Sequence, residues 1–152
     1  MRASKTILAT ILISILATPL LADNELRVTT KLLEQVGKSS TVLKSLNEAI
    51  PDAVVAYEHT LYNPTATLAT DLVFTDIVPE HTTFVKDSAK CNGCTLLYSV
   101  DGEVFEKASE LFTYQSGSLR LAHPEEYRHV RWVIDKLEPH SRQRIIFKTQ
   151  ID

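Results

Sequence analysis

Two cysteines stand three residues apart in the polar stretch Cys91-Asn92-Gly93-Cys94. In an oxidising compartment such a pair most simply forms a disulfide, which would stiffen the loop that contains it. A thiol–disulfide oxidoreductase uses the same spacing, but its first cysteine usually sits at a helix N-terminus, where the thiol pKa falls. Gly93 and the strand-like flanks disfavour a helix. We therefore expect a structural bridge and keep redox activity as the alternative.

The histidines are the next side chains whose type could support chemistry. His59 falls between Tyr57 and Leu61 in an alternating segment, so we expect a hydrogen-bonded, partly buried imidazole. The alternative is a pH-responsive site, because histidine titrates near neutral pH. A zinc site would need His81 and His123 to join the cysteines through the fold. We predict neither a metal site nor a cofactor.

Carboxylates and hydroxyls offer two further patterns. Three carboxylates alternate near one end of the expected fold: Asp71, Asp76 and Glu80. They predict a solvated rim, with a weak calcium site as the alternative. Two pairs have hydrolase residue types: Ser99 with Asp101, and Ser141 with His140. Neither lies in a nucleophile elbow, and a triad is recognised by geometry rather than spacing, so no catalytic residue is predicted.

The N-terminus determines the compartment in which these residues work. Arg2 and Lys5 precede an almost wholly apolar run over 7–21, and the small residue Ala22 follows it. This is the pattern of a secretory signal peptide, so we predict cleavage after Ala22, a signal peptide at 1–22 and a single mature domain at 23–152. An uncleaved anchor is the alternative, but the run is short for a bilayer span and contains Pro19. The protein is expected to be secreted or periplasmic and, after cleavage, not an integral membrane protein.

Signal removal also changes the charge. Two of the 16 basic residues leave and none of the 19 acidic ones, so the mature domain carries a formal charge of −5. A mildly acidic domain is a poor nucleic-acid binder, since neutralising phosphates supplies most of that affinity. The net charge also gives no reason to expect attraction to anionic lipid. The expected partner is an unknown protein at the cell envelope.

Period-two alternation predicts the elements that position these residues. About seven or eight short strands are expected, at 26–32, 55–61, 72–74, 82–88, 96–100, 103–105, 130–134 and 145–151. Asp101-Gly102 predicts a two-residue type I′ hairpin between two of them. The stretch 31–50 has apolar residues at helical spacing, but Gly37, Ser39 and Ser40 interrupt it, so strand, loop and one helical turn are expected. The fold class is an all-β antiparallel sandwich.

Several residues of this pattern suit structural roles. Tyr57 can bury its ring while the hydroxyl reaches backbone. Asn63 and Asp76 stand at strand ends, where short polar side chains fix turns. Pro79 presets φ where the chain changes sheets. Trp132 alternates with Val130 and Ile134 and is expected in the core.

A resemblance adds to these observations. The segments 49–63, 69–79 and 83–88 carry a Pro51-Asp52 turn, a strand with Tyr57 near its start and Asn63 at its end, and a strand closing on Asp76-Ile77-Val78-Pro79. The later segments 98–102, 131–147 and 137–140 continue the pattern. Together they resemble the conserved-repeat domain of bacterial surface proteins, known as domain of unknown function number eleven. The chain differs from this family in three ways: it carries a single copy of the domain, Asp52 follows Pro51 directly without the usual glycine, and His140 stands where glycine is usual.

The resemblance implies an immunoglobulin-like sandwich with a structural or adhesive role at the bacterial envelope. With the compartment and the charge, it leads us to expect a non-enzymatic structural or protein-binding module. The alternatives are an envelope thiol–disulfide protein that uses Cys91 and Cys94, and a metal- or pH-responsive binding domain. An exposed edge strand or the loops at one end of the sandwich could bind the partner.

Overall fold

The computed structural model describes residues 26–36 and 38–152, and the predicted signal peptide lies outside them. The described chain forms ten strands and two 3₁₀ turns, in the order β1 (Arg27–Val36), β2 (Ser39–Leu43), η1 (Leu46–Glu48), β3 (Val54–Tyr62), β4 (Ala69–Ile77), β5 (Thr82–Phe84), β6 (Cys94–Ser99), β7 (Phe112–Gln115), β8 (Ser118–Leu121), η2 (Pro124–Glu126), β9 (His129–Leu137) and β10 (Arg142–Ile151). All strand pairs are antiparallel. The prediction of an all-β antiparallel sandwich is confirmed.

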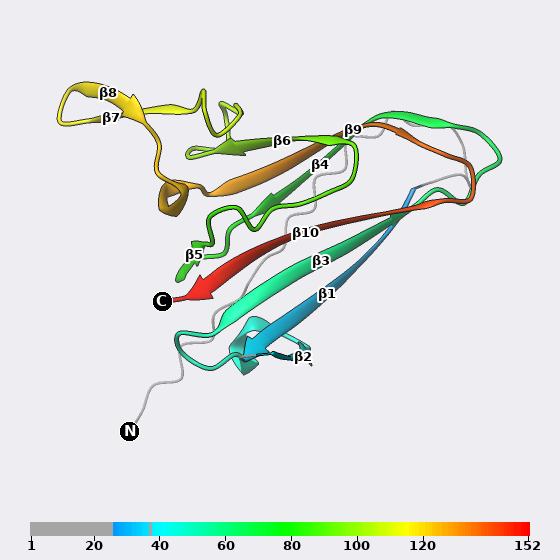
Figure 1. Cartoon of the computed structure of the whole chain (residues 1–152), viewed down its shortest axis with the longest axis horizontal. Coiled ribbons are helices and arrows are strands. Elements are labelled where there is room, and N and C mark those ends of the chain that lie inside the picture. Colours follow the sequence, from blue (N-terminus) through cyan, green and yellow to red (C-terminus); the bar gives the residue numbers. More distant parts are fainter. Residues whose placement is uncertain (1–25, 37) are drawn as a thin grey trace.

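Two sheets form the layers of the sandwich (Figure 1). The first sheet has the strand order β2-β1-β3-β10-β5, and the second has the order β4-β9-β6. A separate two-stranded ribbon, β7–β8, extends from the end of the molecule near β5 and β6. The two sheets therefore bury their facing sides, while the ribbon belongs to neither sheet.

Aromatic rings fill the space between the sheets. Trp132 of β9 is fully buried and lies 5.9 Å, between ring centroids, from both Phe147 of β10 and Phe74 of β4. Phe147 stacks on Tyr57 of β3 at 4.6 Å. Burying a side chain of this size contributes about 2–3 kcal/mol relative to leaving it in water. The alternation that predicts inward positions in β3, β9 and β10 thus identifies the centre of the core.

The predicted hairpin at Asp101-Gly102 is wrong. Gly102 has a φ of 83°, but the φ of Asp101 is not positive, and residues 103–105 form no strand. Instead Asp101 Oδ1 accepts hydrogen bonds from the amides of Glu103 and Val104 at 2.8 and 3.0 Å. These bonds wrap the chain around the carboxylate in a longer turn, after which Glu106 pairs with Tyr98.

The type I′ geometry occurs elsewhere, in the ribbon that sequence analysis missed. Ser116 and Gly117 have φ values of 51° and 80° and connect the paired residues Gln115 and Ser118. Strand β2 was also not predicted, and β5 ends at Phe84 rather than continuing to Ser88. The stretch 31–50 contains the expected strand and a single 3₁₀ turn, with β2 between them.

Candidate functional site

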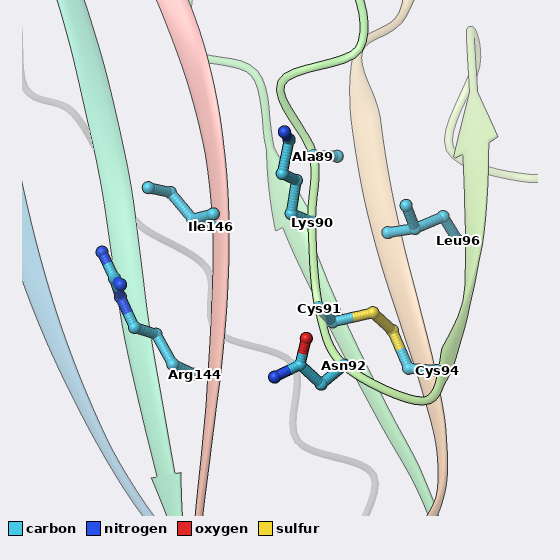
Figure 2. A pocket seen from close by; sticks show the side chains of 8 residues that line it. All are labelled: Ala89, Lys90, Cys91, Asn92, Cys94, Leu96, Arg144 and Ile146. Carbon is cyan, nitrogen blue, oxygen red and sulfur yellow. A yellow bond between two sulfur atoms is a disulfide. The ribbon is translucent and has the colours of Figure 1, made fainter.

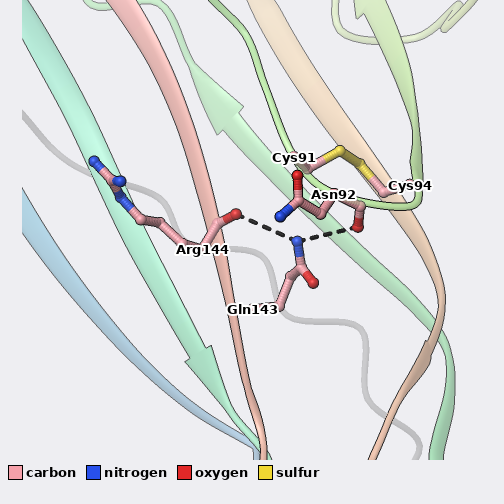
Figure 3. Close-up of a disulfide and its surroundings, with 5 residues drawn as sticks. All are labelled: Cys91, Asn92, Cys94, Gln143 and Arg144. Atoms are coloured by element: carbon pink, nitrogen blue, oxygen red, sulfur yellow. Dashed lines mark hydrogen bonds between the residues drawn. A yellow bond between two sulfur atoms is a disulfide. The ribbon is translucent and has the colours of Figure 1, made fainter.

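The cysteine loop is closed and tied to the sandwich. Cys91 and Cys94 form a disulfide with their Cα atoms 6.0 Å apart, and Cys94 is the first residue of β6. Figure 3 shows Gln143 of β10 donating to the carbonyl oxygens of Asn92 and Arg144, at 3.2 and 3.3 Å. The disulfide therefore closes a loop at the start of β6, and Gln143 together with the Lys90–Ile146 bridge holds this loop to β10. A redox motif would place its first cysteine at a helix N-terminus.

A shallow depression of about 520 Å³ lies between this loop and β10 (Figure 2). Its lining residues come from the loop, from β6 and from β10: Ala89, Lys90, Cys91, Asn92, Cys94, Leu96, Arg144 and Ile146. The disulfide, Leu96 and Ile146 supply apolar surface. Lys90 and Arg144 are exposed and bring positive charge to the rim.

The histidine expected in the core connects the two sheets. His59 of β3 is 2% exposed, and its ring lies 4.8 Å from that of Phe74. Nδ1 lies 2.9 Å from the hydroxyl of Thr30, its partner on β1. Nε2 lies 2.8 Å from Oδ2 of Asp76 on β4, although outside the geometry of an aligned hydrogen bond. Thr30 is on the exposed part of β1, whereas His59 and most of Asp76 are enclosed.

This order of hydroxyl, imidazole and carboxylate resembles the connectivity of a hydrolase triad. Thr30, however, occupies the middle of a paired strand instead of a strained turn, and its imidazole partner is enclosed by the core. We read the contact as a polar link between the sheets. Sequence analysis missed it because Thr30, His59 and Asp76 come from three strands, and only the strand register reveals the pairing of Thr30 with His59.

Asn63 is the most highly connected of the predicted turn residues. Its side chain is buried, and Nδ2 donates to the carbonyl oxygens of Thr67, Leu137 and Glu138 at 2.8, 3.0 and 3.2 Å. Oδ1 accepts from the amide and the hydroxyl of Thr65 at 3.1 and 2.8 Å. The side chain therefore holds the turn after β3 against the turn after β9.

The remaining structural residues lie within the sandwich or at its ends. Burial raises the pKa of Tyr57 to about 12, while the nearby hydroxyl of Thr149 acts in the opposite direction. The buried Tyr57 hydroxyl makes no aligned hydrogen bond, either to Thr149 or to the backbone, so the expected backbone contact is not formed. Pro79 lies in the segment that carries the chain from β4 in one sheet to β5 in the other.

The other candidate pairs and clusters serve turns or stay apart. Ser99 is buried; its hydroxyl donates to Asp101 at 3.0 Å and accepts from the amide of Gly102 at 2.8 Å. The hydroxyl of Ser141 donates to the carbonyl oxygen of Glu138 at 2.7 Å. Across 26–36 and 38–152, no three His, Cys, Asp or Glu side chains gather as metal ligands. The calcium and zinc alternatives thus find no cluster in this part of the chain.

The β7–β8 ribbon presents an apolar face that sequence analysis did not find. Phe112 pairs with Leu121, and Tyr114 pairs with Leu119, so these four side chains share one face. They are 54%, 43%, 76% and 57% exposed, respectively. The sequence did contain a signal for this ribbon: apolar side chains that alternate with a period of two on either side of a Ser-Gly turn.

The opposite face of the ribbon is fixed to the sandwich. Both terminal nitrogens of Arg120 lie 2.8 Å from the Glu126 carboxylate, and its Nε donates to Gln115. The bonds from Arg120, followed by one from the amide of His123, lower the pKa of Glu126 to about 2. Leu111 is buried at the base, where its carbonyl oxygen accepts from the amide of Ala122. The apolar face is therefore held outward.

Comparison with protein-family models, curated proteins and solved structures finds no match. Within the described residues, no helix is long and apolar enough to cross a membrane. The site must therefore be interpreted from its own geometry.

Proposed function

We propose that this protein is a non-enzymatic, secreted or periplasmic module of the bacterial envelope that binds another protein. The observation that carries the proposal is the outward apolar face of the β7–β8 ribbon, made by Phe112, Tyr114, Leu119 and Leu121. Exposed contiguous apolar surface commonly marks an interaction site. Tyrosine and phenylalanine are also enriched where protein partners bind.

The way the ribbon is held supports this proposal. An isolated two-stranded hairpin is marginally stable in water. Here the fork of Arg120 on Glu126 and the buried Leu111 hold the strands in place without covering the apolar side chains. A surface fixed in this way loses little conformational freedom on binding, which favours affinity.

The envelope location and the relation to the conserved-repeat domain belong to the same proposal. The apolar run over 7–21 and the closed disulfide support export, because disulfides persist in oxidising compartments. Fractionation of cells that express the full chain should recover the protein outside the cytoplasm. N-terminal sequencing should then start at Asp23. A cytoplasmic protein that keeps Met1 would contradict the location.

A photo-crosslinking amino acid at position 114, introduced in intact cells, tests the binding function. We expect a specific crosslinked protein, which in purified form binds the wild type but not Leu119→Lys. Val42→Lys is the matched control, because Val42 is also an exposed apolar residue, 66% exposed, but lies on β2. Equal binding by both lysine variants would overturn the assignment of the ribbon as the contact surface.

A further inference from the structure

A second surface lies on the outer face of the five-stranded sheet, away from the ribbon. In β3 and β10, His59, Ile145 and Phe147 face the core, so alternate residues face outward. Strand register places Arg27, Tyr62 and Arg142 in one outward row. Further rows follow along the same strands: Thr29, Thr60 and Arg144; Lys31, Glu58, Ile146 and Lys90; Leu33, Ala56 and Lys148; and Gln35, Val54 and Gln150.

This face is strongly basic, although the mature domain is acidic. It contains six cations, Arg27, Lys31, Lys90, Arg142, Arg144 and Lys148, and one carboxylate, Glu58, which pairs with Arg144. The face therefore has a formal surplus of five positive charges. Asp52 and Asp152 lie beyond its rows, near the end of the sheet where β3 begins and β10 ends. Whole-chain charge conceals this asymmetry.

Three of the cations remain available to a ligand. Arg142 stacks over the ring of Tyr62 at 4.3 Å, and Lys148 donates to Gln35 at 2.8 Å. In contrast, Arg27, Lys31 and Lys90 are exposed and have no carboxylate partner among the residues that the structure describes. Their charges are therefore directed into solvent.

Distance and salt separate this face from the carboxylates on the far side of the sandwich. Stacked sheets lie about 10 Å apart, so carboxylates beyond the second sheet are more than one sheet spacing away. At physiological ionic strength the Debye length is about 8 Å, and exposed charges further apart than this are largely screened. A large anionic surface that approaches the basic face would respond mainly to the local positive charge.

We propose that the outer face of the β1-β3-β10 region docks on an anionic phospholipid bilayer. The cations span three strands and the Lys90 segment, which corresponds to a patch about 14 Å wide and about 20 Å long. A juxtaposed Lys or Arg contributes roughly 1 kcal/mol of attraction to an anionic leaflet. A bilayer surface is wide enough to contact the three available cations, Arg27, Lys31 and Lys90, together.

The chemistry of the face favours a bilayer over a single-stranded nucleic acid. Nucleic-acid binders combine cations with exposed aromatic rings on which bases stack. Tyr62 is the aromatic residue in the rows of this face, and Arg142 already covers its ring. The proposal is independent of protein binding by the ribbon, because it uses different residues on different strands.

Vesicle cosedimentation of the purified protein tests this proposal. The probes are vesicles of phosphatidylcholine alone and vesicles of phosphatidylcholine mixed with phosphatidylglycerol. We expect binding to the mixed vesicles only, and loss of that binding at high salt. The triple substitution Arg27→Gln, Lys31→Gln and Lys90→Gln should weaken binding by about 100-fold.

The matched control is Lys86→Gln, Lys107→Gln and Lys136→Gln, which changes the net charge equally at exposed positions outside these rows. This variant should keep vesicle binding, and both triple variants should melt at the wild-type temperature. Leu119→Lys should also keep vesicle binding, which separates this proposal from protein binding by the ribbon. The proposal would be overturned by equal binding to neutral vesicles or by equal loss of binding in both triple variants. It would also be overturned if the protein bound another polyanion, a single-stranded oligonucleotide or the acidic polysaccharide polygalacturonate, but not the mixed vesicles.

Discussion

The imidazole of His59 and the carboxylate of Asp76 meet across the two sheets, with Nε2 and Oδ2 2.8 Å apart. His59 belongs to β3 and Asp76 to β4, which lie in different sheets. The side chains around this pair between the sheets are mostly apolar, so few other groups there could form hydrogen bonds with His59 or Asp76. Polar groups enclosed in this way cost free energy when their partner is removed.

Asp76→Ala should therefore destabilise the protein by about 1–3 kcal/mol, because the imidazole loses its enclosed partner. Urea unfolding monitored by the fluorescence of Trp132 measures the change. Asp135→Ala is the control, since Asp135 is exposed on β9 of the same sheet as Asp76. It should change stability by less than about 0.5 kcal/mol. Equal effects in the two variants would show that the contact contributes nothing.

Asn63→Ala should cost about 3 kcal/mol, because it leaves buried carbonyl groups of two turns without donors. Asn92→Ala is the matched control; Asn92 is exposed in the disulfide loop, where its backbone rather than its side chain accepts a bond. We expect faster amide exchange around Thr65 and Glu138 in Asn63→Ala alone. Unchanged exchange at both turns would contradict the role assigned to Asn63.

Core alternation was predictable, but the use of turn residues was not. Trp132 and Phe147 occupy buried positions because period-two patterns directly specify which face of a strand is apolar. Asp101-Gly102 and Ser116-Gly117 are both turn signals, and only the second forms a type I′ turn. The difference arises at the Asp101 side chain, which accepts bonds from the Ser99 hydroxyl and from the amides of Glu103 and Val104 and so forms a longer turn.

The candidate surfaces show the same limit. The identity of each cation on the sheet face is visible in the sequence, but their common side depends on the register of β1 and β10 against β3. Likewise, the link from Thr30 through His59 to Asp76 joins residues that are distant in the chain. Net charge and local spacing carry no information about such long-range pairing.

Replacing both Cys91 and Cys94 with serine should lower the free energy of unfolding by at most about 2 kcal/mol, the chain-entropy value for so small a loop. Dithiothreitol should lower the stability of the wild type by a similar amount and leave the double variant unchanged. Both results follow if the bridge stiffens the loop before β6. Turnover of a disulfide substrate by the wild type, absent from the double variant, would instead favour the oxidoreductase alternative.

His129 should make stability depend on pH. Burial lowers its pKa, and Arg131 acts in the same direction, while Asp101 and Asp76 oppose it. The unfolded chain therefore binds the proton more readily than the folded chain. The contribution of neutral His129 is present above about pH 6.5, the ordinary histidine pKa, and is lost as the pH falls through the lowered folded value.

Urea unfolding from about pH 8 to about pH 5 measures this dependence in the wild type and in His129→Gln. The wild type should lose stability relative to the variant as the pH falls. His123→Gln should retain the wild-type dependence, because His123 is exposed. A constant difference between wild type and His129→Gln across this range would contradict the prediction.

His140→Gly should stabilise the protein by about 0.5–1 kcal/mol. His140 has a φ of 53°, a left-handed conformation that strains a side chain with a Cβ and that glycine adopts freely. The greater freedom of glycine in the unfolded chain offsets part of this gain. Gly117→Ala provides the reverse test. Gly117 has a φ of 80° in the ribbon turn, so alanine at this position should destabilise the protein. If alanine were tolerated there and glycine gave no gain at position 140, left-handed strain would not determine the stability of these turns.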